Sequence, residues 1–101
     1  MQNLVIADDL VGPTKAGLKR NTIRAGIRDI KTGPLELRSS SGTYPPITVD
    51  VVEVSHKLAN EVSDREIVAN GFRDLADMLA GMKRFYPDFG PSSQVTVITW
   101  R

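Results

Sequence analysis

Residues 17–24 join the end of a helix to the start of a strand, and they read Gly17-Leu18-Lys19-Arg20-Asn21-Thr22-Ile23-Arg24. We expect a short helix from Pro13 to Ala16, because proline suits a first helical position and Gly17 suits the stop that follows. Thr22 and Ile23 favour extended backbone, because β-branched side chains pack well on a pleated strand. The segment therefore predicts a helix, a turn and a strand in succession, with cations spaced along it.

Positive charge is concentrated around this segment, although the formal net charge of the chain is only +1. Residues 15–38 carry seven basic side chains against two acidic ones, and the seven are Lys15, Lys19, Arg20, Arg24, Arg28, Lys31 and Arg38. Residues 50–77 carry seven acidic side chains against three basic ones. A basic cluster either binds an anion or is solvated surface, and the charge pattern by itself supports both interpretations.

Length and composition predict one globular domain over residues 1–101. The chain is 41% hydrophobic and 25% charged, close to globular averages, and a chain of 101 residues has room for one core. No apolar run approaches the roughly 20 residues that span a bilayer, and residues 1–9 lack the layout of a signal peptide. We therefore expect a cytoplasmic protein without a membrane span.

The chain has no cysteine and a single histidine, His56. A disulfide framework, a thiolate zinc site and a multi-histidine metal centre are therefore excluded. We expect no metal and no cofactor.

Four strands are predicted from apolar alternation and turn residues. They cover residues 1–7, residues 35–37, residues 47–54 and residues 95–100, and a fifth extended segment is residues 19–24. Val52 and Val54 break the alternation of residues 47–54, which predicts a strand that is covered on both faces.

Two helices are predicted between the last two of these strands. Ser63 and Glu66 have the spacing of a capping box, so a helix should begin there and end near Gly71. A second helix is expected over residues 73–85, because an apolar stripe recurs at helical spacing, namely Leu75, Met78, Leu79 and Met82. Residues 86–91 should end it, since they contain two prolines. Together the elements predict an α+β fold with a compact, barrel-like sheet and flanking helices.

The segment Gly-Leu-Lys-Arg-Asn-Thr-Ile-Arg at residues 17–24 resembles the signature of the ASCH family, Gly-x-Lys-x-x-Thr-Ile-Arg. Later features resemble the family in the same order: Lys31-Thr32-Gly33, the strand over residues 47–54, Asn70-Gly71-Phe72, Phe85-Tyr86-Pro87 and Val95-Thr96-Val97-Ile98. The resemblance covers about residues 10–100. It implies a PUA-like small β-barrel with flanking helices and a cleft beside the signature, in a family proposed to bind RNA.

One branch of this family removes the acetyl group of acetylcytidine with a lysine, a threonine and a glutamate. By resemblance the first two correspond to Lys19 and Thr22, whereas Asn70 stands where that branch has its glutamate. An amide cannot act as a general base, so a carboxylate would have to come from elsewhere. Glu66 is the candidate because it lies one helical turn before Asn70, although the capping box alone also explains Glu66.

Two further functions are compatible with the sequence. Some ASCH-like proteins have been proposed to cleave single-stranded RNA, and Lys19, Arg24 and His56 would then supply the base and the cations. A lone histidine after a strand is also an ordinary surface residue. An interaction protein whose basic face docks on an acidic partner is the other possibility.

Binding without catalysis is the function that requires the fewest specialised residues. The expected ligand is RNA, a nucleoside or a nucleotide, held by side chains that offer cations, hydrogen-bond donors or a stacking ring: Lys19, Arg20, Thr22, Arg24, Arg28, Asn70 and Tyr86. An ion pair with Asp29 or a later acidic residue is the alternative role of Arg24. Tyr44 and Tyr86 are expected in loops where a base can stack, whereas Phe72, Phe85 and Trp100 are expected in the core.

Overall fold

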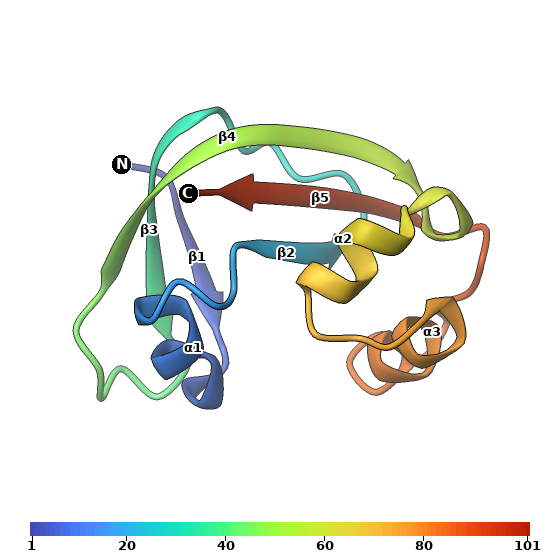
Figure 1. Ribbon diagram of the computed structural model, residues 1–101, viewed down its shortest axis with the longest axis horizontal. Coiled ribbons are helices and arrows are strands. Elements are labelled where there is room, and N and C mark those ends of the chain that lie inside the picture. Colours follow the sequence, from blue (N-terminus) through green and yellow to red (C-terminus); the bar gives the residue numbers. More distant parts are fainter.

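The computed structural model describes all residues 1–101, and its core is one sheet flanked by short helices (Figure 1). The strands are β1 (Asn3–Ile6), β2 (Asn21–Ala25), β3 (Gly33–Ser39), β4 (Ile47–Leu58) and β5 (Gln94–Trp100). The helices are α1 (Val11–Lys15), α2 (Asp64–Ala69) and α3 (Leu75–Lys83), with 3-10 turns at Asp8–Leu10 and Ala59–Glu61. None of these helices has the length and apolarity that a bilayer crossing requires.

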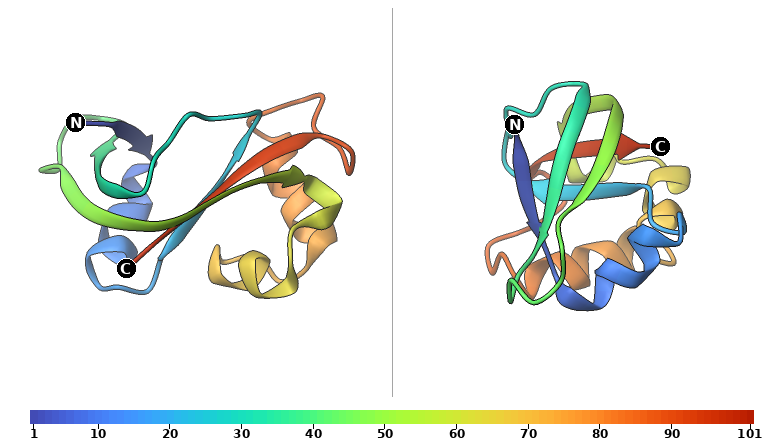
Figure 2. Two further views of the ribbon diagram at one scale, coloured as in Figure 1. Left: turned by 90° about the horizontal axis from the view of Figure 1, so that it is seen from above. Right: turned by 90° about the vertical axis from the view of Figure 1, so that its left-hand side faces the viewer.

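The strand order is β1-β3-β4-β5-β2, so β1 and β2 are the two edges. β1 runs parallel to β3, and the other neighbours are antiparallel. The long β4 curves, so the sheet bends into a half-barrel (Figure 2). The Nη2 atom of Arg24 on β2 donates to the carbonyl of Val5 on β1 at 2.8 Å, which links the two edges. The predicted α+β, barrel-like architecture is confirmed.

Two apolar clusters lie on opposite faces of the sheet. The barrel cluster fills the concave face and consists of Ile6, Val11, Leu35, Leu37, Val49, Val51, Ile98 and Trp100. The helix cluster packs α2 and α3 on the other face and consists of Ile23, Ala59, Val62, Ile67, Met78, Met82, Phe89, Val95 and Val97. β5 contributes to both clusters because alternate side chains of a strand point to opposite faces. The predicted core role of Met78 and Met82 is confirmed.

β4 differs from its sequence-based prediction in length and in coverage. It extends to Leu58, four residues beyond the predicted end at Val54. Val52 is 44% exposed, so the prediction that this strand is covered on both faces is wrong. The register against β5 shifts between Val51 and Glu53, and such a bulge places two residues opposite one. The bulge, and not burial of both faces, therefore explains why the alternation breaks.

The helices largely follow the predicted signals. α1 begins at Val11, two residues before Pro13, and Gly17 ends the segment with a φ of +76°, which glycine tolerates. The capping box of Ser63 and Glu66 is present at the start of α2. α3 covers Leu75–Lys83, which is shorter than the helix predicted over residues 73–85.

Because α3 ends at Lys83, Phe85 lies beyond the helix and is 75% exposed. Its predicted place in the core is therefore wrong. Trp100 is buried and Phe72 is half-buried against the helix cluster, as predicted for both.

Candidate functional site

Lys19 lies in the turn between α1 and β2 and is only 8% exposed. The backbone amides of Leu18 and Lys19 both donate to the carbonyl of Pro13, which holds this turn against α1. The Nζ atom of Lys19 donates to Oδ1 of Asn70 at 2.9 Å. Asn70 caps the C-terminus of α2, so this bond joins the basic turn to a helix that lies 51 residues away in the sequence.

The environment of Lys19 disfavours its positive charge. Burial and the neighbouring Arg24 guanidinium lower the pKa of Lys19 from 10.5 to about 8. The protein has five ion pairs, and none of them includes Lys19. A buried cation is normally paired with a carboxylate, so Lys19 is an uncompensated charge in a poorly solvated position.

Thr22 and Arg24 lie on the concave side of β2, opposite Ile98 and Thr96 of β5. Thr22 is buried, and its hydroxyl oxygen accepts from Nε of Arg24 at 3.0 Å. Burial lowers the pKa of Arg24, Tyr86 acts in the opposite direction, and Arg28 lowers this pKa further. Tyr86 and Arg28 therefore each lie within electrostatic reach of the Arg24 guanidinium.

Arg24 has no acidic partner, because Asp29 pairs with Lys31 instead at 3.1 Å. The predicted alternative role of Arg24 in an ion pair is thus wrong. Its guanidinium is held by Thr22 and by the Val5 carbonyl across the barrel.

The other two arginines of the predicted site are held by backbone carbonyls. Arg20 is exposed and its Nε atom donates to Gly17 at 3.0 Å, while Nε of Arg28 donates to Ala25 at the same distance. Neither arginine takes part in an ion pair. Their remaining N–H groups are free to meet an anion.

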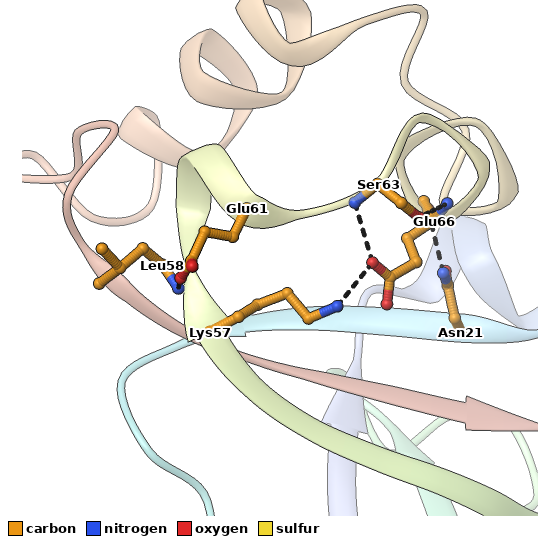
Figure 3. A network of polar contacts seen from close by, with 6 residues as sticks. All are labelled: Asn21, Lys57, Leu58, Glu61, Ser63 and Glu66. Atoms are coloured by element: carbon orange, nitrogen blue, oxygen red, sulfur yellow. Dashed lines mark hydrogen bonds and ion pairs between the residues drawn. The ribbon is translucent and has the colours of Figure 1, made fainter.

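The carboxylate of Glu66 is engaged by Ser63 and Lys57, as Figure 3 shows. Its Oε1 atom accepts from the backbone of Ser63 and from Nζ of Lys57, each at 2.9 Å. Burial raises the pKa of Glu66, but the bonds from Ser63 and Lys57 outweigh burial and lower it overall. The capping interpretation is confirmed, whereas the catalytic role of Glu66 stays a prediction. Lys57 was not anticipated, because nothing in its local sequence marks a partner nine residues away.

Two other candidate residues, His56 and Tyr86, make no hydrogen bond to Lys19. His56 is exposed on β4, and its Nε2 atom is 3.1 Å from the carbonyl of Arg28. Tyr86 follows α3 and is half-buried, with its ring 6.4 Å from that of Phe89. No group of three or more histidine, aspartate or glutamate residues comes together in a metal-binding arrangement.

Lys19 lines a hollow of about 440 Å³ between α1 and the ends of β4 and β5. We call it the basic hollow, and its lining is Thr14, Lys15, Gly17, Lys19, Arg20, Ile47, Thr48, Val49, Trp100 and Arg101. Four of these side chains are cationic and none is acidic. Arg101 was not anticipated, because the terminus reaches the hollow only when β5 pairs in the sheet.

Comparisons with known proteins give one structural match. No family model and no curated protein matches the chain. A crystal structure of an ASCH domain from Lactobacillus crispatus is similar, with a TM-score of 0.70 and 17% sequence identity. The match covers 92% of this chain and 67% of that one.

Proposed function

We propose that this chain, which has the fold of an ASCH domain, binds RNA or a nucleotide in the basic hollow. The observation that carries the proposal is the buried, unpaired charge of Lys19. A phosphate at Nζ would supply the counter-charge that the protein does not, and arginines nearby would add planar donors. Asn70 bonds to Lys19 and Thr22 bonds to Arg24, and these three partners lie outside the lining of the basic hollow.

The electrostatic reason for anion binding is that the partly desolvated Lys19 ammonium group has no counter-charge when no ligand is bound. A cation in a poorly hydrated position has lost favourable solvation, and an incoming anion restores a favourable partner. The same partial burial strengthens the interaction, because the local dielectric is lower than that of water. An exposed lysine cluster would gain much less from the same ligand.

The first test is a titration of the purified protein with short single-stranded RNA at low and moderate salt. We expect binding that weakens steeply with salt, because phosphate contacts release counterions. Lys19→Met should weaken binding roughly tenfold and reduce the salt slope by about one. Lys83→Met removes an exposed lysine outside the hollow and serves as the control. Binding that persists unchanged in Lys19→Met would refute the proposal, and an acidic protein partner would then become the leading alternative.

The contact between Lys19 and Asn70 also bears on the hydrolysis of acetylcytidine, and it argues against this second function. Asn70 stands where the hydrolase branch of the resembled family has its glutamate, and this position does face Lys19. The amide nevertheless cannot take a proton from a hydroxyl or from water. We therefore expect the protein to release no acetate from acetylcytidine at high enzyme concentration. Acetate release would make the protein an enzyme and not only a binder.

A further inference from the structure

Lys19 is a primary amine, and the binding proposed above uses only its cationic form. In the neutral form Nζ carries a lone pair, which makes a lysine amine a good nucleophile toward a carbonyl carbon. Two conditions favour the neutral form in proteins, namely loss of solvation and the presence of other cations. Lys19 meets both, because it is buried and shares the basic hollow with other cationic side chains.

No carboxylate counteracts these two conditions. Nζ of Lys19 donates to the neutral amide oxygen of Asn70, and Lys19 takes part in none of the five ion pairs. The carboxylate one turn earlier on α2, that of Glu66, is engaged in the capping box and by Lys57. Burial and the Arg24 guanidinium therefore act unopposed, in agreement with the lowered pKa of Lys19.

The other four lysines of the chain lie in different surroundings. Lys31 and Lys57 are paired with acidic side chains, and Lys15 and Lys83 are exposed to water. An acidic partner and full hydration both favour the ammonium form. Lys19 alone combines burial with the absence of an acidic partner.

The basic hollow can hold an anionic compound next to this amine. Its free cations are Lys15 and Arg20, which take part in no ion pair. Its apolar lining consists of Ile47, Val49 and Trp100. A phosphate or carboxylate group suits the cations, and the hydrocarbon part of the same compound suits the apolar side chains.

From this arrangement we infer that Lys19 is a nucleophilic amine, which forms an imine with an aldehyde or ketone that carries a phosphate or carboxylate group and enters the basic hollow. Neutral Nζ attacks the carbonyl carbon, and a proton passes from nitrogen to the carbonyl oxygen to give a carbinolamine. Loss of one water molecule then leaves a carbon–nitrogen double bond. A protonated imine keeps one N–H, which the Asn70 amide oxygen can accept. This reaction requires no RNA, so it goes beyond the function proposed above.

The test uses pyridoxal phosphate as the probe and pyridoxal, which lacks the phosphate, as its counterpart. Each is incubated with the unsubstituted protein near neutral pH, and borohydride reduces any imine to a stable secondary amine. Peptide mass spectrometry then measures the labelled fraction at each of the five lysines. Each probe is judged by the rate at Lys19 relative to the other lysines, so the different intrinsic reactivities of the two probes cancel.

We expect pyridoxal phosphate to label Lys19 roughly tenfold faster than any other lysine, because more of Lys19 is neutral. Pyridoxal should show a smaller preference for Lys19. Unfolding in urea should abolish the preference of both probes, since the fold creates it.

Three variants separate the nucleophile from the cations. Lys19→Arg keeps the charge but should lose the fast-labelled site, whereas Lys83→Arg, outside the hollow, should keep it. Arg20→Gln should lower the preference of pyridoxal phosphate for Lys19 by roughly two- to fivefold, the usual contribution of one exposed charge, and leave that of pyridoxal unchanged.

Two results would overturn the inference. Labelling of Lys19 no faster than that of Lys83 would show that Lys19 is not a nucleophilic amine. An equal preference of both probes for Lys19 would show that the hollow does not select an anionic compound. Both results come from the unsubstituted protein, so they hold even if a variant fails to fold, and the RNA titration decides the proposed function separately.

Discussion

Lys19 is the residue on which the site depends, because it combines burial with an uncompensated charge. Its ammonium group donates to the side-chain amide oxygen of Asn70. It forms no ion pair with a carboxylate. Burial and Arg24 lower its pKa to about 8, within reach of ordinary buffers. The protonation of this one side chain should therefore control both ligand affinity and part of the stability.

Affinity for RNA should fall as the pH rises through about 8, because unliganded Lys19 loses its charge there. A bound phosphate favours the ammonium form, so binding should take up a proton at and above this pH. Binding at pH 9 should be roughly tenfold weaker than at pH 7, and calorimetry in buffers of different ionisation enthalpy measures the proton uptake. Lys19→Met should lose this pH dependence. Equal affinity of the unsubstituted protein at both pH values would contradict the assignment.

Lys19→Met should stabilise the protein while it weakens binding. The folded pKa of Lys19 is depressed from 10.5 to about 8, so the unfolded chain binds more protons between these values. The unfolding free energy should therefore rise with pH across that interval, and at pH 7 the charge opposes folding. Removing it should add roughly 1–3 kcal/mol in urea denaturation at pH 7. Lys83→Met should change stability little, and a less stable Lys19→Met would show that the bond to Asn70 outweighs burial.

Among the elements, α2 positions the site although it is only six residues long. Its capping box fixes the N-terminus, its backbone carbonyl at Glu66 accepts from Asn21 at 3.1 Å, and its C-terminus presents Asn70 to Lys19. A helix this short is not stable by itself in water. Its cap and its packing on the sheet therefore hold Asn70 in place.

Ser63→Ala should cost about 1 kcal/mol of unfolding free energy, because the hydroxyl oxygen no longer accepts from the Glu66 backbone. Hydrogen exchange of the α2 amides should accelerate more than that of β5, since the loss is local. Ser92→Ala, at an exposed serine in the loop before β5, is the control. Uniform acceleration of both elements would show that α2 unfolds only together with the sheet.

In the whole molecule, the two edge strands are tied by one arginine. β1 and β2 lie at opposite ends of the strand order, and Arg24 joins them through the Val5 carbonyl. The same guanidinium donates to the hydroxyl oxygen of Thr22, another residue of the predicted site. Closure of the barrel and organisation of the binding surface are therefore coupled.

Arg24→Lys keeps the charge but cannot reproduce the two guanidinium bonds, so the barrel edge should loosen. We expect a loss of about 1.5–3 kcal/mol in unfolding free energy, the usual range for a hydrogen bond from a charged donor. Hydrogen exchange should accelerate in β1, an edge strand four residues long. Arg20→Lys, which changes only a contact within its own turn, is the comparison. Unchanged protection of β1 would mean that packing alone closes the barrel.

Local signals in the sequence were enough for much of the fold. The cap at Ser63, the stop at Gly17, the apolar stripe of α3 and the alternating strands each depend on residues within one turn or one strand. The concentration of basic residues around Lys19 is likewise visible without a structure.

Other features depend on residues that meet only when the chain is folded. The bond from Lys19 to Asn70 spans 51 residues, and the bulge in β4 is defined by its register against β5. The edge contact of Arg24 with Val5 arises from strand order, which no local pattern encodes. Composition and spacing therefore indicated an α+β domain with one basic segment, whereas long-range packing decided which cation is buried, what it contacts and where the basic hollow lies. The physical reason is that desolvation and hydrogen-bond geometry are properties of neighbours in space, not of neighbours in the chain.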